Sequence, residues 1–266
     1  MPEGDTVHLA AARLDAALKN QTITATDFRV PRYATADLTG TTVLNVVARG
    51  KHLLFRFDDG RSLHTHFKME GTWHLYRRGE RWRGGPGHEI RAILETERWV
   101  AVGWRLAVVD LIATASEAEL LSHLGPDVLG PDWDAGEALA RIEKDPERSI
   151  GAVLLDQRVI AGPGNVYKCE ICFLRGLHPE TPVGAVEDLP GLVDLTKRLM
   201  EANRSTGDQN TTGDARRGRK QWVYGRGGGP CRRCGTLIER KAEPGDRVTY
   251  WCPSCQPLMA ARRGPI

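Results

Sequence analysis

The spacing of apolar residues near the start of the chain predicts a helix. Apolar positions recur at i, i+3, i+4 and i+7, which places them on one helical face; they are Val7, Ala10, Ala11, Leu14, Ala17 and Leu18. Asp5 or Thr6, just before this run, is a suitable N-cap. We therefore expect an amphipathic helix that buries one face against the rest of the fold.

Between residues 41 and 109 the pattern changes to β-branched and alternating stretches separated by turns. Turn residues such as Asp58, Asp59 and Gly60 lie between them. Strands at this density, with glycine-containing turns, predict a β-sandwich or barrel. The predicted strands are Thr41–Val47, Lys51–Phe57, Leu63–Phe67, Thr72–Tyr76, Glu89–Glu95 and Trp99–Val109.

Beyond residue 115 the pattern becomes helical. Gly125-Pro126 and Gly130-Pro131 indicate a linker over 116–131. Predicted helices are Ser116–Leu124, Ala135–Glu143, Ile150–Leu155, Gly164–Gly176 and Leu189–Asn203. The fold class is therefore α+β with several domains: a β-sandwich with a leading helix over 1–115, the linker, a helical domain over 132–220, and a closing module over 221–266.

The distribution of charge along the chain, and not the overall composition, indicates a class of partner. The chain has 266 residues, 41% of them hydrophobic, and a net charge of +3. Residues 204–241 hold ten Lys or Arg and three acids, a local balance of +7. Such a concentrated basic segment favours binding to the phosphate backbones of nucleic acids. The alternative is an ordinary solvated surface. No apolar signal core and no run of about 18 apolar residues occurs, so we expect a cytoplasmic protein without a membrane span.

The cysteines predict a structural zinc site. In a cytoplasmic chain, paired cysteines bind metal more often than they form disulfides. Four thiolates complete a tetrahedral zinc shell and leave no open position for chemistry. The two C-x2-C pairs, separated by 17 residues with a β-hairpin between them, are Cys231, Cys234, Cys252 and Cys255.

Four other side chains are of types that can bind a metal, but we do not expect them to do so. Cys169 and Cys172 are three residues apart on a predicted helix, where small apolar fillers are expected. His64 and His66 share one face of a predicted strand but lack an obvious third ligand. We expect packing or hydrogen bonding for both pairs.

The N-terminus offers a nucleophile. Removal of Met1 exposes the secondary amine of Pro2, and an α-amino group titrates near pH 8. Much of it is therefore unprotonated at neutral pH and able to attack a sugar C1′. The resulting iminium acidifies the C2′ proton and permits elimination of phosphate. Read alone, Pro2 and Glu3 would be ordinary residues that lead into a helix.

Several segments together carry a family resemblance: MPEGDTVH at 1–8, ARGKHLLFRF at 48–57, DQRVIAGPGNVYKCEICFLRGLHP at 156–179, WVYGRGGGPCRRCGTLIER at 222–240 and RVTYWCPSCQ at 247–256. The chain resembles the formamidopyrimidine-DNA glycosylase and endonuclease VIII family, and most closely its endonuclease VIII branch. The resemblance implies a catalytic β-sandwich domain and a helical domain with a helix–two-turn–helix motif and a zinc finger. It also implies damaged DNA as the partner of a monomer that works at the nucleoid.

The resemblance also assigns roles to residues. Pro2 resembles the nucleophile and Glu3 the general acid/base beside it. Lys51, counted with them as catalytic, resembles the hairpin lysine that contacts phosphates at the lesion. Asn165 and Arg247 resemble residues that bind backbone phosphates. The isolated alternatives are a surface salt bridge for Lys51 and Arg247 and a helix cap for Asn165.

Two departures from the family pattern affect the expected substrate. Met69 is the best wedge for the gap left by a flipped nucleotide, because it is long, apolar and adaptable. It is flanked by Lys68 and Glu70, where the endonuclease VIII type uses a larger set with an aromatic. No Arg-x-Phe pair follows the Trp99 strand, which favours oxidised pyrimidines as substrates.

The predicted activity is that of a bifunctional DNA glycosylase and abasic-site lyase in base excision repair. It forms a Schiff base at Pro2 and proceeds by β,δ-elimination. A non-catalytic zinc-ribbon protein that binds DNA is the alternative; it accounts for the cysteines and the basic segment but leaves the N-terminal Pro-Glu idle.

Overall fold

The computed structural model describes residues 1–243 and 247–258. The chain divides into two units, Met1–His123 and Leu124–Ile266, and the division falls inside the predicted linker. Each unit has its own buried core. The finer division at residues 115, 131 and 220 stays a prediction.

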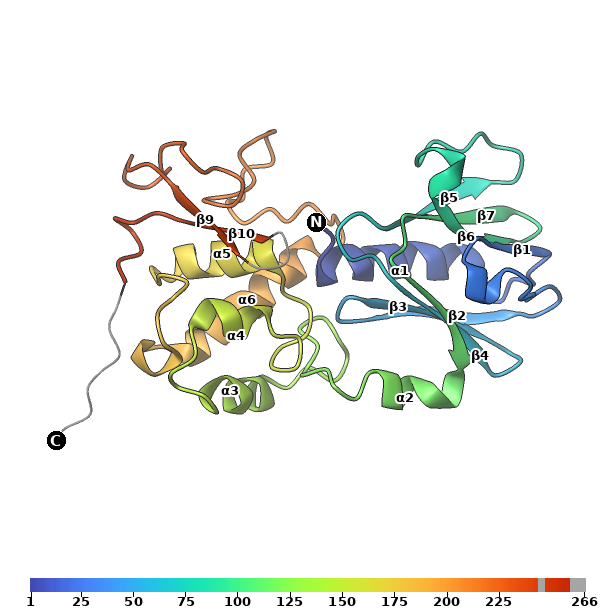
Figure 1. Cartoon of the computed structure of the whole chain (residues 1–266), viewed down its shortest axis with the longest axis horizontal. Coiled ribbons are helices and arrows are strands. Elements are labelled where there is room, and N and C mark those ends of the chain that lie inside the picture. The colour runs from blue at the N-terminus through green and yellow to red at the C-terminus, as the bar shows by residue number, and fades with distance from the viewer. Residues whose placement is uncertain (244–246, 259–266) are drawn as a thin grey trace. The chain divides into compact units, whose positions relative to one another are not determined.

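The first unit is a sandwich of two four-stranded antiparallel sheets (Figure 1). One sheet has the order β2-β3-β4-β8, formed by Val43–Arg49, His52–Phe57, Arg61–His66 and Val108–Ala113. The other has the order β1-β6-β7-β5, formed by Ala25–Phe28, Ile90–Glu95, Trp99–Trp104 and Thr72–Arg77.

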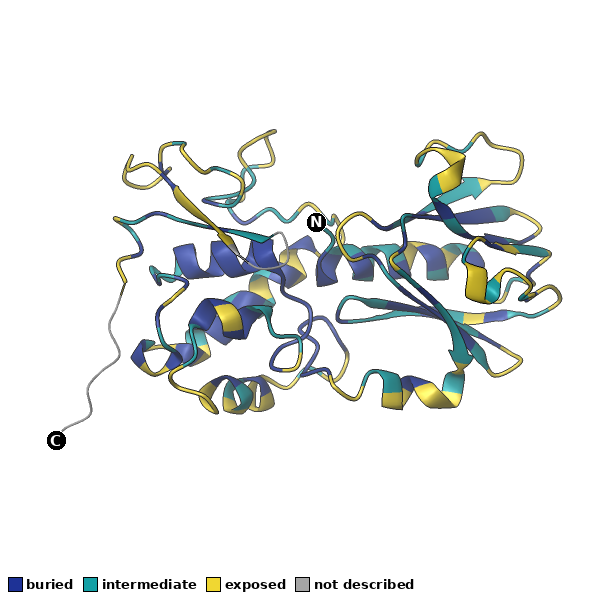
Figure 2. Ribbon diagram, viewed as in Figure 1, coloured by how far each residue is buried: buried dark blue, intermediate teal, exposed yellow. Residues whose placement is uncertain are grey.

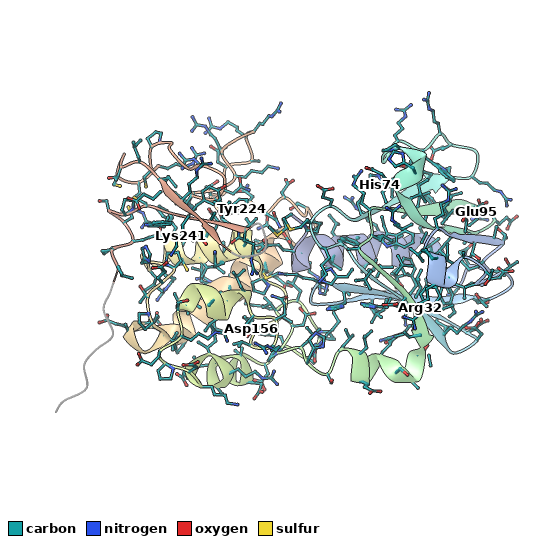
Figure 3. All side chains as sticks on the ribbon, in the orientation of Figure 1. Arg32, His74, Glu95, Asp156, Tyr224 and Lys241 are labelled. Atoms are coloured by element: carbon teal, nitrogen blue, oxygen red, sulfur yellow. The ribbon has the colours of Figure 1, made fainter. Side chains whose placement is uncertain are left out.

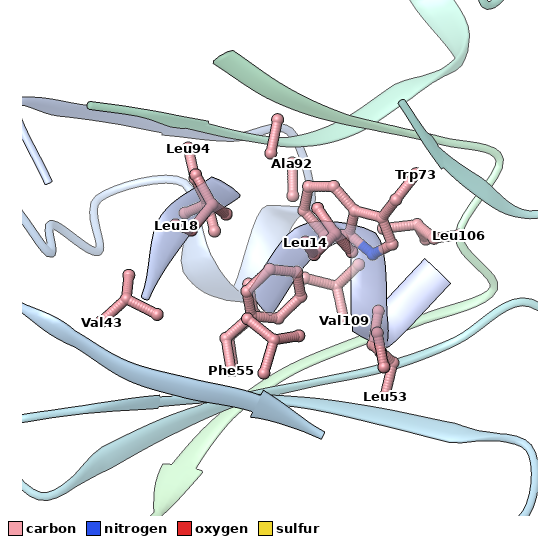
Figure 4. Close-up of a cluster of buried hydrophobic side chains, with 14 of the residues drawn as sticks. Leu14, Leu18, Val43, Leu53, Phe55, Trp73, Ala92, Leu94, Leu106 and Val109 are labelled. Carbon is pink, nitrogen blue, oxygen red and sulfur yellow. The ribbon is translucent and has the colours of Figure 1, made fainter. Parts of the chain in front are cut away.

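Helix α1 (Gly4–Leu18) contributes to the core that both sheets share. Figure 4 shows Leu14 and Leu18 between the two layers, close to Phe55 on one side and Leu94 on the other. Leu14 and Phe55 are each at most 2% exposed. Truncation of such a side chain to alanine costs about 2–5 kcal/mol, so this core fixes the position of the chain's first residues.

The structure corrects several predicted boundaries in this unit. Helix α1 begins at Gly4 with Glu3 as its N-cap, so neither Asp5 nor Thr6 is the cap. The predicted strand Trp99–Val109 is two strands, because the backbone turns at Arg105, which has a φ of 49°. Strand β1 was not predicted. The predicted helix Ser116–Leu124 is reduced to a 3-10 turn, Thr114–Ser116, and the short α2, Glu117–Leu120.

Helices dominate the second unit. Helices α3 (Ala135–Glu143), α4 (Ile150–Leu155) and α6 (Leu189–Asn203) have the predicted bounds. Each begins at a side chain that accepts a hydrogen bond from the first turn, which explains why the sequence locates them well; these residues are Asp134, Ser149 and Asp188. Helix α5 (Asn165–Leu174) is slightly shorter than predicted and is buried from Asn165 to Phe173 (Figure 2).

A two-stranded hairpin completes the described part of this unit. Strands β9 (Glu239–Glu243) and β10 (Arg247–Trp251) pair antiparallel. Cys169 and Phe173 of α5 pack with Val223, Ile238 and Cys252 in one small core beneath the hairpin. The predicted Pro-Gly turn at its tip lies outside the described residues. No helix among residues 1–243 and 247–258 is long and apolar enough to cross a membrane.

Candidate active site and zinc centre

The N-terminal segment presents a partly exposed proline followed by a fully buried acid. Pro2 is partly exposed, whereas Glu3 and Asp5 are both 0% exposed. Glu3 has extended backbone (φ −123°, ψ −174°), and its carbonyl accepts the first helical hydrogen bond, from Val7 N at 3.1 Å. The positive end of a helix dipole stabilises a carboxylate at this position. The arrangement holds an acid next to the residue that becomes the terminus when Met1 is removed.

Lys51 lies in the two-residue turn that joins β2 to β3. Arg49 pairs with His52 across this turn, and Gly50 has a φ of 56°, a conformation that glycine adopts without strain. Lys51 is partly exposed. The tight turn limits the freedom of the lysine backbone and presents its side chain at the end of the hairpin.

Beside this turn lies a histidine cluster, consisting of His52, His64, His66 and His123. His52 Nδ1 and His64 Nε2 are 2.8 Å apart, and the ring centroids of His52 and His66 are 4.8 Å apart. Burial, together with neighbouring positive groups, lowers the pKa of His52 to about 3. Burial and the charges of Lys68 and Lys51 lower the pKa of His66 to about 4. These two imidazoles are therefore neutral at pH 7 and add no charge next to Lys51.

His64 and His66 thus hydrogen-bond, as predicted: His66 Nδ1 accepts from Lys68 N at 2.9 Å. The sequence analysis did not predict a role for His52, whose imidazole partner His64 lies 12 residues away in the chain. Cross-strand register was the signal that could have found it, because His52 is directly opposite His66.

Met69 is held outward by the loop between β4 and β5. It is 48% exposed, one of the few large apolar side chains in the described residues with such exposure. Lys68 has a φ of 53°, and Gly71 N donates to Phe67 O at 2.9 Å. A Cβ on Gly71 would lie 2.7 Å from Phe67 O, so only glycine fits this tight loop. The structure therefore offers Met69 to solvent, as a wedge would require.

In the second unit Asn165 is the first residue of α5 and is 2% exposed. Its Nδ2 donates to Val248 O on β10 at 2.9 Å, whereas its Oδ1 has no hydrogen-bond partner within the described residues. Gly164, and not Asn165, is the N-cap of the helix. Asn165 thus connects α5 to the strand that begins with Arg247.

Arg247 lines a groove of about 500 Å³ within the second unit. The groove has five cationic and two acidic side chains among its walls: Arg148, Arg158, Lys168, Lys241 and Arg247, with Asp156 and Glu180. Asp156 binds Arg148 at 2.9 Å and Arg158 at 2.8 Å, and Glu180 binds Lys241 at 2.5 Å. The net charge of the lining is positive, which suits an anionic ligand.

The four predicted cysteine ligands converge. Their Sγ atoms all lie within 4.8 Å of one another, and no other group of three or more Cys, His, Asp or Glu side chains in the described residues comes close enough to share an ion. Cys231 Sγ is 3.9 Å from Cys255 Sγ, and Cys234 Sγ is 3.5 Å from Cys252 Sγ. Tetrahedral Zn–S bonds of 2.3 Å separate sulfurs by about 3.8 Å. The set fits one structural zinc ion.

Cys169 and Cys172 are packing residues, as predicted. Both are 0% exposed. Burial raises the pKa of the Cys172 thiol to about 12, so it remains protonated.

Comparison with known proteins identifies the fold. The formamidopyrimidine-DNA glycosylase N-terminal domain matches residues 1–125, the H2TH domain of the same enzymes matches residues 124–203, and the zinc finger found in FPG and IleRS matches residues 228–258. The two units and the four-thiolate centre therefore define a zinc-finger protein of the DNA glycosylase class. The chain belongs to the formamidopyrimidine-DNA glycosylase and endonuclease VIII family.

Individual relatives confirm the endonuclease VIII branch. The chain is 53% identical to "Probable endonuclease 8 2" of Streptomyces coelicolor, over 99% of this chain and 97% of that protein. It is 48% identical to "DNA-(apurinic or apyrimidinic site) lyase Nei2" of Mycolicibacterium smegmatis, over 96% and 99%. The crystal structure of Lactococcus lactis formamidopyrimidine-DNA glycosylase with DNA containing an abasic site superposes with a TM-score of 0.80 at 24% identity, covering 96% of this chain and all of that one. That structure supports the fold.

Proposed function

We propose that this chain is a bifunctional DNA glycosylase and abasic-site lyase of base excision repair, with Pro2 as its nucleophile. The observation that carries the proposal is the N-terminal geometry: a partly exposed Pro2 directly before the fully buried carboxylate of Glu3. A zinc-ribbon protein that merely binds DNA would not need this arrangement. The family match extends over the N-terminal unit as well as the finger, which leaves that alternative without support.

The proposed chemistry follows from these two groups. The Pro2 nitrogen attacks C1′ of the damaged nucleotide, the C1′–base bond breaks, and an iminium forms between nitrogen and sugar. Glu3 donates a proton as the base leaves, and the proton lost from the Pro2 nitrogen passes to O4′ as the sugar ring opens to the iminium. The Glu3 carboxylate later accepts the C2′ proton, and one carboxylate near the developing cation can fill both roles in turn. Loss of the C2′ proton expels the 3′ phosphate, and a second elimination expels the 5′ phosphate. Water then releases the enzyme.

The remaining predicted residues have binding roles in this proposal. Lys51 on the β2–β3 turn and Arg247 on β10 neutralise phosphates that become leaving groups. Asn165 supports the phosphate contact through its bond to Val248 O beside Arg247. Met69 enters the space left by the extruded base.

Oxidised pyrimidines are the proposed lesions. The turn after β7 reads Arg105, Leu106, Ala107, and Leu106 is 4% exposed, so no aromatic side chain projects from this turn. The enzyme would act as a monomer at the nucleoid in the cytoplasm, on duplex DNA or DNA with single-stranded character.

The test is to separate the two chemical steps in one variant. Glu3→Gln removes the proton donor but leaves the amine. It should abolish excision of an oxidised pyrimidine and keep substantial nicking of DNA that already has an abasic site. The abasic nicking of the same preparation controls for folding. Equal loss of both activities with an intact fold would contradict this separation, because Glu3 would then act in a step common to both reactions and not specifically in base release.

A further inference from the structure

The connection between β5 and β6 crosses the outer face of its sheet. Both strands pair with β7, and Thr72 and Ile90 are each opposite Trp104. Since β5 and β6 therefore run in the same direction, the chain must return from the Arg77 end to the Trp104 end. We call this segment, residues 78–89, the arginine crossover; it is the teal loop near the β5 label in Figure 1.

Aromatic contacts hold the arginine crossover against the sheet. Trp82 packs on the outer-face cluster that includes Trp104 and Tyr76, and Arg83 N donates to the Tyr76 hydroxyl at 3.1 Å. A Cβ on Gly84 would lie 2.5 Å from the Trp104 ring, so the backbone follows the sheet closely. His74, labelled in Figure 3, packs on the same face, 5.3 Å from the Trp104 ring. The segment is therefore anchored by Trp82, and its charged side chains lie on the outside.

Three arginines of this segment carry charge without counterions. Arg78, Arg81 and Arg83 are exposed. No ion pair or side-chain hydrogen bond joins any of these guanidiniums to another residue in the described part of the chain. The one acid among residues 77–83 is Glu80, whose carboxylate accepts from Arg77 N at 2.5 Å. Residues 77–83, which include Arg77 at the end of β5, therefore have a net charge of +3 (four arginines, one glutamate). Glu89, the other acid of the arginine crossover, is already paired with Arg105.

The basic segment predicted from the sequence is more fully neutralised than this one. Arg216 lies 2.6 Å from Asp214, and Lys220 lies 2.8 Å from Asp208. Arg232 donates to the backbone carbonyl of Gly218 at 2.6 Å. The arginine crossover is thus a concentrated source of uncompensated positive charge in the first unit.

One end of the arginine crossover is joined to the loop that bears Met69. Glu89 binds Arg105 Nη1 at 2.5 Å, and Arg105 Nε donates to Glu70 O at 3.4 Å. Strand β5 has six residues, and the five steps from its first residue to its last span roughly 17 Å at about 3.3 Å per step. That length corresponds to about five base pairs of duplex at about 3.4 Å per step. Phosphates flanking a lesion at Met69 therefore fall within reach of these arginines.

We propose that Arg78, Arg81 and Arg83 form a second contact with the DNA backbone, about four to five base pairs from the lesion on one side. The inference rests on the proposed function, because it takes the position of the lesion from the proposed role of Met69 as the wedge. The arginines would add affinity without sequence preference, since phosphate contacts carry no base information. An acidic peptide is the rival occupant of the same surface.

The experiment measures the salt dependence of binding to two asymmetric duplexes that carry a stable abasic analogue. Each has three base pairs on one side of the analogue and fifteen on the other, and the two are mirror images. The triple variant Arg78→Gln, Arg81→Gln, Arg83→Gln should flatten the log–log salt slope by up to about 2.7 units, at about 0.9 per contact. This change should occur on one duplex only, the one whose long flank reaches the arginine crossover.

Two further variants sharpen the result. The matched control replaces three arginines that are already ion-paired and lie outside the basic segment, Arg61, Arg141 and Arg198, with glutamine and should leave both slopes unchanged. Replacing Arg78, Arg81 and Arg83 with lysine should restore the slope, because charge and not shape is required.

An unchanged slope on both duplexes overturns the inference, as does an equal change on both. Loss of binding to a glutamate-rich peptide with an unchanged DNA slope assigns the surface to the rival occupant. Failure of the wild-type protein to nick abasic DNA would instead refute the proposed function. The slopes would still report on the arginines in that case, so the two failures are distinguishable.

Discussion

Glu170 should be the most sensitive single position for the stability of the second unit. It lies on α5 and is 0% exposed. Its Oε1 accepts from Val223 N at 2.9 Å and Tyr224 N at 2.8 Å, and its Oε2 accepts from Trp222 N at 2.7 Å and from the Thr211 hydroxyl. One carboxylate therefore ties the helix to the two segments that precede the zinc finger.

The expected loss in the free energy of unfolding follows from the hydrogen-bond donors that Glu170→Ala would leave without an acceptor. A buried donor without a partner costs about 1–3 kcal/mol. Val223 is fully buried, whereas Trp222 and Tyr224 are partly exposed and can recover water. Burial also raises the pKa of Glu170, because it disfavours the charged form. Removal of that buried charge therefore offsets part of the loss in stability. We expect a net destabilisation of about 3 kcal/mol, compared with about 5–15 kcal/mol for a whole domain.

Urea unfolding at fixed zinc concentration measures this loss, and amide hydrogen exchange locates it. Protection should fall at Trp222, Val223 and Tyr224 while the α1 amides of the first unit keep theirs. Glu170→Gln, which retains one acceptor oxygen, should lose less than the alanine variant. A loss below about 1 kcal/mol with all three amides still protected would refute the reasoning.

Three further outcomes are expected. Cys252→Ser should bind less than one zinc per chain by metal analysis and weaken DNA binding, because Cys252 directly follows the strand that carries Arg247; full zinc occupancy would count against the assigned ligands. Arg247→Gln should flatten the salt slope of DNA binding by about 0.9 units, and an unchanged slope would place that phosphate contact elsewhere. Hydrogen bonds from Arg158 and Arg148 hold the pKa of Asp156 well below its usual range, so its stabilising contribution is present at pH 7 and disappears as the pH falls below about 4. Denaturation of Asp156→Asn should therefore show a deficit of about 1–3 kcal/mol at pH 7 that shrinks at pH 3, and a deficit independent of pH would contradict this origin.

Local signals predicted much of the fold. Helices α3, α4 and α6 were located correctly because Asp134, Ser149 and Asp188 mark their starts. The break between β7 and β8 was missed because Arg105 adopts a positive φ without a glycine to announce it.

Tertiary pairing limited the prediction of the site. The four cysteines were evident from spacing alone, since two short turns fix the ligands. The His52–His64 contact and the Glu170 anchor depend on groups 12 and up to 54 residues apart, which no local pattern reveals. The arginine crossover was overlooked because charge counting cannot distinguish paired from unpaired arginines.

The central claim is that the amine of Pro2 is the attacking nucleophile, and borohydride trapping tests it most directly. Reduction of the iminium should link the processed protein covalently to DNA with an abasic site, and mass mapping should place the link on the N-terminal nitrogen of Pro2. A protein that retains Met1 should trap little DNA, because the Pro2 nitrogen is then part of a peptide bond. Trapping at the wild-type level by the Met1-retaining protein, or a link that maps to Lys51, would contradict the account and assign the attack to a lysine.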